Sequence, residues 1–163
     1  IMVDAYQDIT IPFQMSSVEF FTMVKEHLNE NGVMVVNMNM RGNNEGNINQ
    51  YLSDTIASVF DHIVTVDVDG STNRELYASS NADMVKTLEN NANETGHSDL
   101  RDMMLHVADT SSVYEAGDYI MTDDKAPVEL LGMQVIDQLI QGEVAYYKDI
   151  FEKDGINGLL ESL

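Results

Sequence analysis

Apolar runs of strand length alternate with amphipathic segments in the first half of the chain, and this alternation constrains the fold more than any other feature. Residues 1–3 and 33–36 are continuous apolar runs, and residues 62–68 are rich in Val and Ile. Helical spacing of apolar residues predicts helices from Val18 to the Asn31-Gly32 pair and over residues 48–60. A continuous apolar run close behind a helix is typical of a parallel strand covered on both faces.

A fourth, shorter strand is predicted over residues 74–79, after the turn at Asp69-Gly70. This strand would return antiparallel and form a hairpin with residues 62–68 at one edge of the sheet. The order strand–helix–strand–helix–strand–strand predicts an α/β fold with a mostly parallel sheet of about four strands and flanking helices. Residues 1–80 would form this unit, and residues 81–163 a mainly helical extension packed on the same domain.

The second half contains three predicted helical stretches, over residues 82–96, from Ser98 or Asp99 to about Ala108, and from Pro127 to about Tyr147. On the last of these, apolar residues are spaced to share one face: Val128, Leu131, Val135, Leu139 and Val144. Residues 109–118 read as a loop and Tyr119-Ile120-Met121 as a short extended piece. Gly155 and Gly158 interrupt a final short helical segment.

Acidic residues dominate the charge of this 163-residue chain. It has 28 Asp and Glu against 8 Lys and Arg, so its formal net charge is −20. This charge argues against nucleic acid and anionic membranes as partners, and favours cationic ligands such as polyamines. With no Cys, the chain has no disulfides or thiol chemistry. Neither a signal peptide nor an apolar stretch of the ~20 residues that a membrane helix needs is visible, and we expect a cytoplasmic protein.

Candidate functional side chains follow two of the predicted strands. Asp4, Tyr6 and Asp8 come after residues 1–3, and Asn37 follows the second strand. In an open parallel sheet, ligands bind outside the carboxyl ends of the strands. An acidic residue there can hold an amine or act as a general base, although a loop Asp can also simply cap a helix or turn. The four His residues lack the spacing of a metal site, and no metal is expected.

A second acidic pair, Asp123-Asp124, precedes the helix that begins near Pro127. Acidic residues near a helix start compensate the helix dipole. This structural role and a role in ligand binding both stay open for the pair.

Two parts of the chain, taken together, resemble the spermidine synthase-like proteins. The matching residues, in order, are Val3-Asp4-Ala5-Tyr6, Ile11-Pro12, Ser17, Glu19, Phe20, Leu28, Gly32-Val33 and Val35-Val36-Asn37, followed by Thr122-Asp123-Asp124 and Ala126-Pro127-Val128-Glu129. The likeness covers residues 1–40 and 121–129. Between these parts it extends only to the order of the predicted elements.

The resemblance implies the methyltransferase-type Rossmann fold and transfer of an aminopropyl group from decarboxylated S-adenosylmethionine to a polyamine, without a metal. It places Asp4 and Tyr6 beside the adenosylmethionine-type co-substrate. Gln7 stands where the family has its catalytic Asp, so Asp8, one residue on, becomes the candidate base, with Asp4 as the other catalytic candidate. The resemblance also implies that Asp123, Asp124 and Asn37 line the acceptor pocket.

The chain departs from the family in one larger respect. No Gly-x-Gly follows a strand, so the family's N-terminal nucleotide-binding half has no counterpart here. We therefore expect a fragment or one domain of a longer protein, inactive by itself. Its apolar first strand would be covered by the missing N-terminal half, by a second copy in a homo-oligomer, or by the later helices. Two alternatives stay open: a methyltransferase that uses S-adenosylmethionine on a small molecule, and a non-catalytic oligomerisation or regulatory domain.

Overall fold

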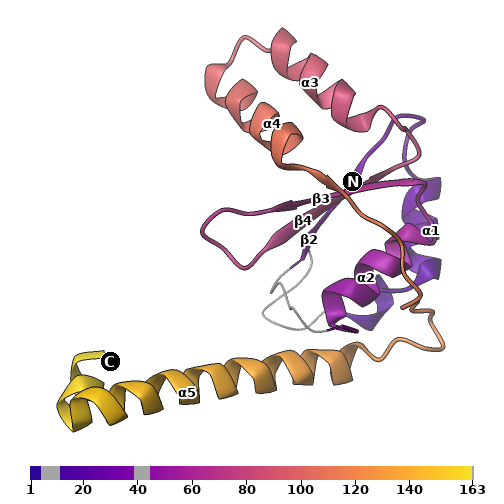
Figure 1. Ribbon diagram of the computed structural model, residues 1–163. Helices are drawn as coiled ribbons and strands as arrows, with labels where there is room; N and C mark the ends of the chain where they lie inside the picture. The colour runs from indigo at the N-terminus through magenta and orange to yellow at the C-terminus, as the bar shows by residue number, and fades with distance from the viewer. Residues whose placement is uncertain (5–11, 39–44, 163) are drawn as a thin grey trace.

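A computed structural model describes residues 1–4, 12–38 and 45–162 of the chain (Figure 1). Its described part contains a five-stranded sheet with helices on both faces, which confirms the α/β class. The elements are, in order, β1 (Met2–Val3), a short 3₁₀ helix (Phe13–Met15), α1 (Val18–Glu26), β2 (Met34–Met38), α2 (Ile48–Ala57), β3 (His62–Asp67), β4 (Arg74–Ser79), α3 (Met84–Glu94), α4 (Ser98–Thr110), β5 (Ser112–Val113) and α5 (Val128–Ser162).

The sheet is mostly antiparallel, so the prediction of a mostly parallel sheet is wrong. The strand order is β1-β2-β4-β3-β5, and only β1 and β2 pair in parallel. The predicted hairpin of β3 and β4 forms, but β4 does not lie at an edge. It inserts between β2 and β3 and pairs antiparallel with both. The strands β1, β2 and β3 therefore run in the same direction. Most pairings are antiparallel because β4, which runs in the opposite direction, lies between β2 and β3.

One face of the sheet forms the main hydrophobic core with α1 and α2. The alternation of a strand turns Met34, Val36 and Met38 of β2 toward this face, where all three are fully buried. The core also contains apolar residues from both helices, from β3 and β4 and from the chain near α5: Phe21, Val24, Ile48, Leu52, Ile56, Ile63, Leu76, Ala78, Met121, Val128 and Leu131. This core holds the carboxyl ends of β1 and β2 side by side.

The other face of the sheet lies under the α3–α4 hairpin (Figure 1). The side chains that alternate with the core residues point here, and most of them are half-buried: Val35 and Asn37 on β2, and Glu75 and Tyr77 on β4. The register pairs Val35 with Tyr77 and Asn37 with Glu75. Apolar residues therefore occupy the middle of this face, and polar residues its edge at the carboxyl end of β2.

Residues 112–127 lie against the sheet edge and then along α2 and α1. Ser112 and Val113 form β5 beside β3, where a loop was predicted. The extended piece predicted at residues 119–121 is not part of the sheet. Instead Met121 donates its backbone N–H to Thr55 Oγ1 of α2 and accepts a bond from the N–H of Val18. These bonds to helix side chains and termini take the place of ladder bonds.

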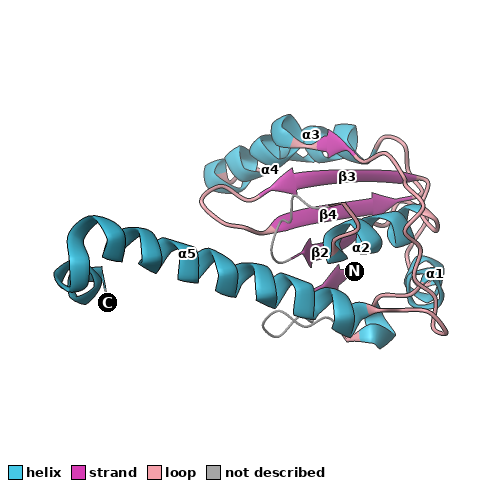
Figure 2. Ribbon diagram, turned by 60° about the horizontal axis from the view of Figure 1, so that its bottom comes forward, coloured by secondary structure: helices cyan, strands magenta, loops and turns pink. Residues whose placement is uncertain are grey.

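The helix α5 extends well beyond the sheet and its covering helices (Figure 2). Its first turns are anchored by Val128 and Leu131, which are buried in the core as predicted. Val144, predicted on the same face, is 61% exposed, because the helix has left the core by that point. Gly155, at φ 64°, interrupts the helical backbone as predicted, whereas Gly158, predicted to do the same, lies within the helix. No helix in the described part of the chain is long and apolar enough to cross a membrane.

Candidate functional site

Two of the predicted site residues meet at the carboxyl ends of β1 and β2. Asp4 follows β1 directly, and Asn37 lies next to the last residue of β2. Because these strands are parallel neighbours, their ends lie at the same edge. The Asn37 side-chain amide donates a hydrogen bond of 3.2 Å to Asp4 Oδ1, in an exposed position. The amide thus orients a carboxylate that solvent and ligands can reach.

Glu75 of β4 adds a second carboxyl group that the sequence analysis did not identify. It lies opposite Asn37 in the β2–β4 ladder. Glu75 Oε2 and Asn37 Oδ1 are buried atoms without a hydrogen-bond partner among the described residues. A buried polar atom without a partner is energetically costly and is rare in folded proteins. The cluster of Asp4, Asn37 and Glu75 therefore combines one exposed carboxylate with two buried acceptor oxygens that have no described partner.

The electrostatics of this cluster favour a cation. Burial raises the pKa of the Glu75 carboxyl above its usual value, and the nearby charge of Asp4 raises it further. Burial also raises the pKa of Tyr77, with a further contribution from Glu75. A positive charge placed between Asp4 and Glu75 would relieve the repulsion between them. In the sequence, Glu75 is an acidic residue two positions before Tyr77 in a predicted strand. This pattern places both side chains on one face of the sheet, but it does not indicate which strand lies beside them.

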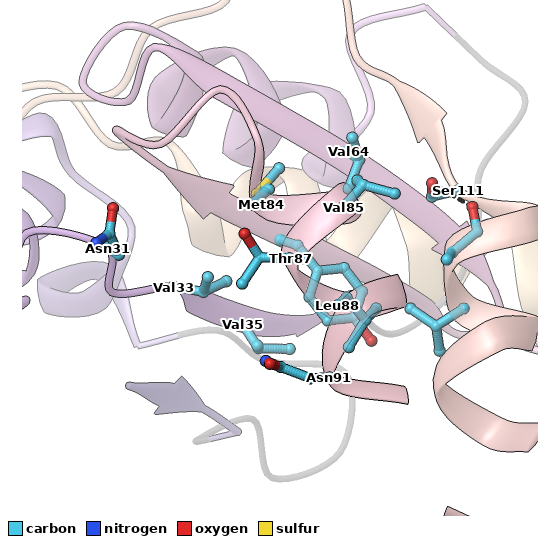
Figure 3. Close-up of a pocket in the computed structure, with 13 residues that line it drawn as sticks. Asn31, Val33, Val35, Val64, Met84, Val85, Thr87, Leu88, Asn91 and Ser111 are labelled. Atoms are coloured by element: carbon cyan, nitrogen blue, oxygen red, sulfur yellow. Dashed lines mark hydrogen bonds between the residues drawn. The ribbon is translucent and has the colours of Figure 1, made fainter. Parts of the chain in front are cut away.

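A cavity of about 310 Å³ lies on the same sheet face, under α3 and α4 (Figure 3). Its floor includes Val35 and Tyr77, each two residues along its strand from Asn37 and Glu75. The side chains that line it are all uncharged: Asn31, Val33, Val35, Val64, Tyr77, Met84, Val85, Thr87, Leu88, Asn91, Val107, Ala108 and Ser111. This cavity has the apolar surface to hold methylene groups but, apart from the Tyr77 hydroxyl, no group suited to proton transfer.

The second predicted acidic pair lies at the start of α1. Ser17, the N-cap residue of α1, donates its hydroxyl to Asp123 Oδ1, and the backbone N–H of Asp123 donates to Glu19 Oε2 at 3.0 Å. Asp124 is exposed in the adjoining turn, which a bridge between Thr122 and Lys125 closes. The carboxylate of Asp123 therefore belongs to the capping structure of α1, and its role in binding an acceptor stays a prediction.

The remaining predicted residues, Tyr6 and Asp8, lie outside the described residues. Among the described residues, Asp54 of α2 is the one fully buried Asp, and it was not predicted from the sequence. It accepts bonds from the Tyr114 hydroxyl at 2.6 Å and from the backbone N–H groups of Gly117 and Tyr119. With all these bonds inside the protein, Asp54 holds the 114–119 segment and is not available to a ligand. Within the described ranges, no three His, Asp or Glu side chains are grouped so as to hold a metal ion.

The fold and the site together define an α/β protein with an acidic cluster at the carboxyl edge of its sheet. No protein-family model matches the chain. The whole chain is 51% identical to a probable polyamine aminopropyl transferase of Bifidobacterium longum (strain NCC 2705), and it spans 40% of the length of that relative. Over its whole length the chain is therefore similar to part of a spermidine synthase-like protein.

A solved structure, that of a probable spermidine synthase from Corynebacterium glutamicum ATCC 13032, is also similar. It is 16% identical to the chain, with 75% of this chain and 49% of that chain covered. The TM-score is 0.38, which is too low for conclusions about shared geometry.

Proposed function

We propose that the complete protein transfers an aminopropyl group from decarboxylated S-adenosylmethionine to an amine of a polyamine. The name and the 51% identity of the Bifidobacterium longum relative support this reaction. The structural observation that supports it most directly is the cluster of Asp4, Asn37 and Glu75, whose acceptor oxygens lie at the edge of the sheet. Polyamines and the aminopropyl donor are both cations, and each has ammonium groups that could donate to such oxygens.

The chemistry requires a neutral amine as nucleophile. Its nitrogen forms a bond to the carbon beside the sulfonium sulfur as the carbon–sulfur bond breaks, and the electron pair of that bond stays on sulfur. The acceptor amine must therefore lose a proton, and we propose Asp8 as the base that takes it. Asp4, with Tyr6, would bind the co-substrate. Asn37, Asp123 and Asp124 would line the acceptor pocket.

A finer description of the fold belongs to the same proposal. We propose that residues 1–80 are the C-terminal half of a methyltransferase-type Rossmann sheet and that residues 81–163 extend it. The shared direction of β1, β2 and β3 supports this assignment, as does the meeting of Asp4 and Asn37 where ligands bind in such sheets. A cytoplasmic location is proposed with it.

The proposal is tested with the complete protein and two donors. Turnover of decarboxylated S-adenosylmethionine with a polyamine acceptor is expected, and no methyl transfer from ordinary S-adenosylmethionine. The change Asp8→Asn should lower kcat at least about 100-fold, in the range of general base catalysis. Asp61→Asn, at an exposed ion pair with Lys25, is the control and should leave kcat unchanged.

Each outcome distinguishes the candidate functions. Unchanged turnover in the Asp8→Asn protein would remove Asp8 as the base. Methyl transfer in place of aminopropyl transfer would establish the methyltransferase alternative, for which the residue Gln7 at the usual base position is the supporting observation. If calorimetry detects no binding of either donor or of a polyamine by the complete protein, the chain is a non-catalytic domain.

A further inference from the structure

The projecting part of α5 exposes a stripe of apolar side chains on one side. Leu130, Met133, Ile140, Val144 and Phe151 are each more than half exposed, at 60%, 61%, 54%, 61% and 53%. With Asp137 and the half-buried Tyr147, they follow one another at alternating intervals of three and four residues. We call these seven residues the α5 seam. A contiguous group of large, exposed apolar side chains is typical of an interaction surface.

The spacing of the seam identifies the kind of partner. Intervals of three and four give a mean repeat of 3.5 residues, which is the a/d pattern of a coiled coil. We propose that the α5 seam pairs with the α5 seam of a second copy of this chain, as a parallel two-stranded coiled coil. A seam of this type is self-complementary, because each side chain fits between side chains of an identical helix.

The size of the seam is sufficient for a dimer. From Leu130 to Phe151 the helix is about 33 Å long at 1.5 Å per residue. The five exposed apolar side chains would each bury on the order of 100 Å², which gives roughly 1,000 Å² over both partners, the lower limit of a specific interface. Val128 and Leu131 are buried against the body of the protein, so the seam is a second apolar side of the same helix.

The charges beside the seam favour the parallel direction. Glu143 and Lys148 lie on opposite sides of it, five residues apart, where opposite charges of two parallel helices pair across the interface. Between residues 130 and 151 the only other charged side chains are Asp137 and Asp149, so the stretch has three acidic residues and one Lys, a net charge of 1 − 3 = −2. Asp137 lies within the seam and would face its own copy, which fixes the register but weakens the pairing.

Sedimentation equilibrium of the complete protein over a range of concentrations tests the proposal. We expect a reversible equilibrium between monomer and dimer. Val144→Lys places a charge in the seam and should weaken the dimer at least about tenfold. Asp137→Leu removes the apposed charges and should strengthen it by a similar factor. Ile156→Lys is the matched control: Ile156 is 66% exposed but lies beyond Gly155, outside the seam, and its change should leave the dimer unaffected.

Introduced Cys residues give a second test of the parallel register, in which Ala145→Cys controls for disulfides formed elsewhere in the complete protein. Val144→Cys should form a disulfide between two copies under mild oxidation, and Ala145→Cys, one residue off the seam, should not. A complete protein that stays monomeric at all concentrations would overturn the proposal, as would a dimer insensitive to Val144→Lys. A monomer destabilised by Val144→Lys would mean that another part of the same protein covers the seam. Failure to crosslink at position 144 would overturn the parallel register.

Discussion

Glu75, on an interior strand, lies in the candidate site at the carboxyl edge of the sheet. Its carboxyl group lies beside Asn37 because β4 is inserted next to β2, and Asp4 is close enough to raise its pKa. A carboxyl group with a raised pKa binds its proton more tightly in the folded than in the unfolded protein. The folded state therefore loses stability relative to the unfolded state as the pH rises above the usual pKa of Glu.

We predict that Glu75→Gln changes how the stability of the protein depends on pH. Gln does not titrate, so the variant should be more stable than the wild type above the raised pKa of Glu75. The difference should shrink toward low pH, where Glu75 is protonated in both states. Urea unfolding between pH 4 and 7 measures it. Glu89→Gln, which removes an exposed charge from α3, controls for net charge. A stability difference that does not change with pH would contradict the assignment.

Asp54 shows the opposite use of a buried carboxylate, which is purely structural. Its two oxygens accept three bonds from the 114–119 segment. The same contact excludes a side chain at Gly117, because a Cβ there would lie 2.6 Å from Asp54 Oδ2. The carboxylate also raises the pKa of Tyr114, after the larger effect of burial.

Replacement of Asp54 should therefore destabilise the fold. The change Asp54→Asn removes the charge and sets an amide N–H₂ against backbone donors, at an expected cost of about 3 kcal/mol in the free energy of unfolding. Asp61→Asn, at an exposed ion pair, should cost less than about 1 kcal/mol. Chemical denaturation measures both. Equal effects of the two changes would show that Asp54 does not anchor the segment.

At the scale of elements, the start of α1 connects two distant parts of the chain. Ser17 caps the helix by accepting from the N–H of Phe20 and also bonds Asp123, which lies 106 residues further along. The connection places the turn before α5 against α1. The capping of one helix thereby fixes where another helix leaves the body of the protein.

We predict that Ser17→Ala lowers the free energy of unfolding by about 1–2 kcal/mol, through loss of the cap and of the bond to Asp123. Ser98→Ala in the first turn of α4 is the control, because Ser98 is exposed and bonds only its neighbour Asp99 among the contacts described. Thermal and urea unfolding check the difference. If both variants lose the same small stability, the contact with Asp123 has no energetic value.

At the scale of the whole chain, its charge of −20 opposes the compact state of these 163 residues. The ion pairs described in the structure, such as those of Lys25 with Asp61 and of Arg74 with Asp67, are partly or largely exposed and offset little of it. The free energy of unfolding should therefore rise, by on the order of 1 kcal/mol, when NaCl is raised from 10 mM to 0.5 M. Denaturation at both salt concentrations tests this, and a fall in stability with salt would contradict it.

Local patterns predicted most elements of this protein closely. The start of α1 at Val18, β4 over residues 74–79 and the break at Gly155 depend on capping, alternation and glycine, and all three were found. The juxtaposition of Asp4 and Asn37 also followed from the sequence, because the ends of two parallel strands must lie at one edge. These features depend on neighbours in the chain or on a general rule of topology.

Only the tertiary structure decided which strands pair and which residues join the site. An interior strand offers hydrogen-bonding groups on both sides, and its sequence does not say which neighbours use them. The sequence therefore did not predict that β4 inserts between β2 and β3, or that Glu75 lies beside Asn37. The structural role of Asp54 was not predicted for a similar reason, because its partners lie 60 or more residues away along the chain.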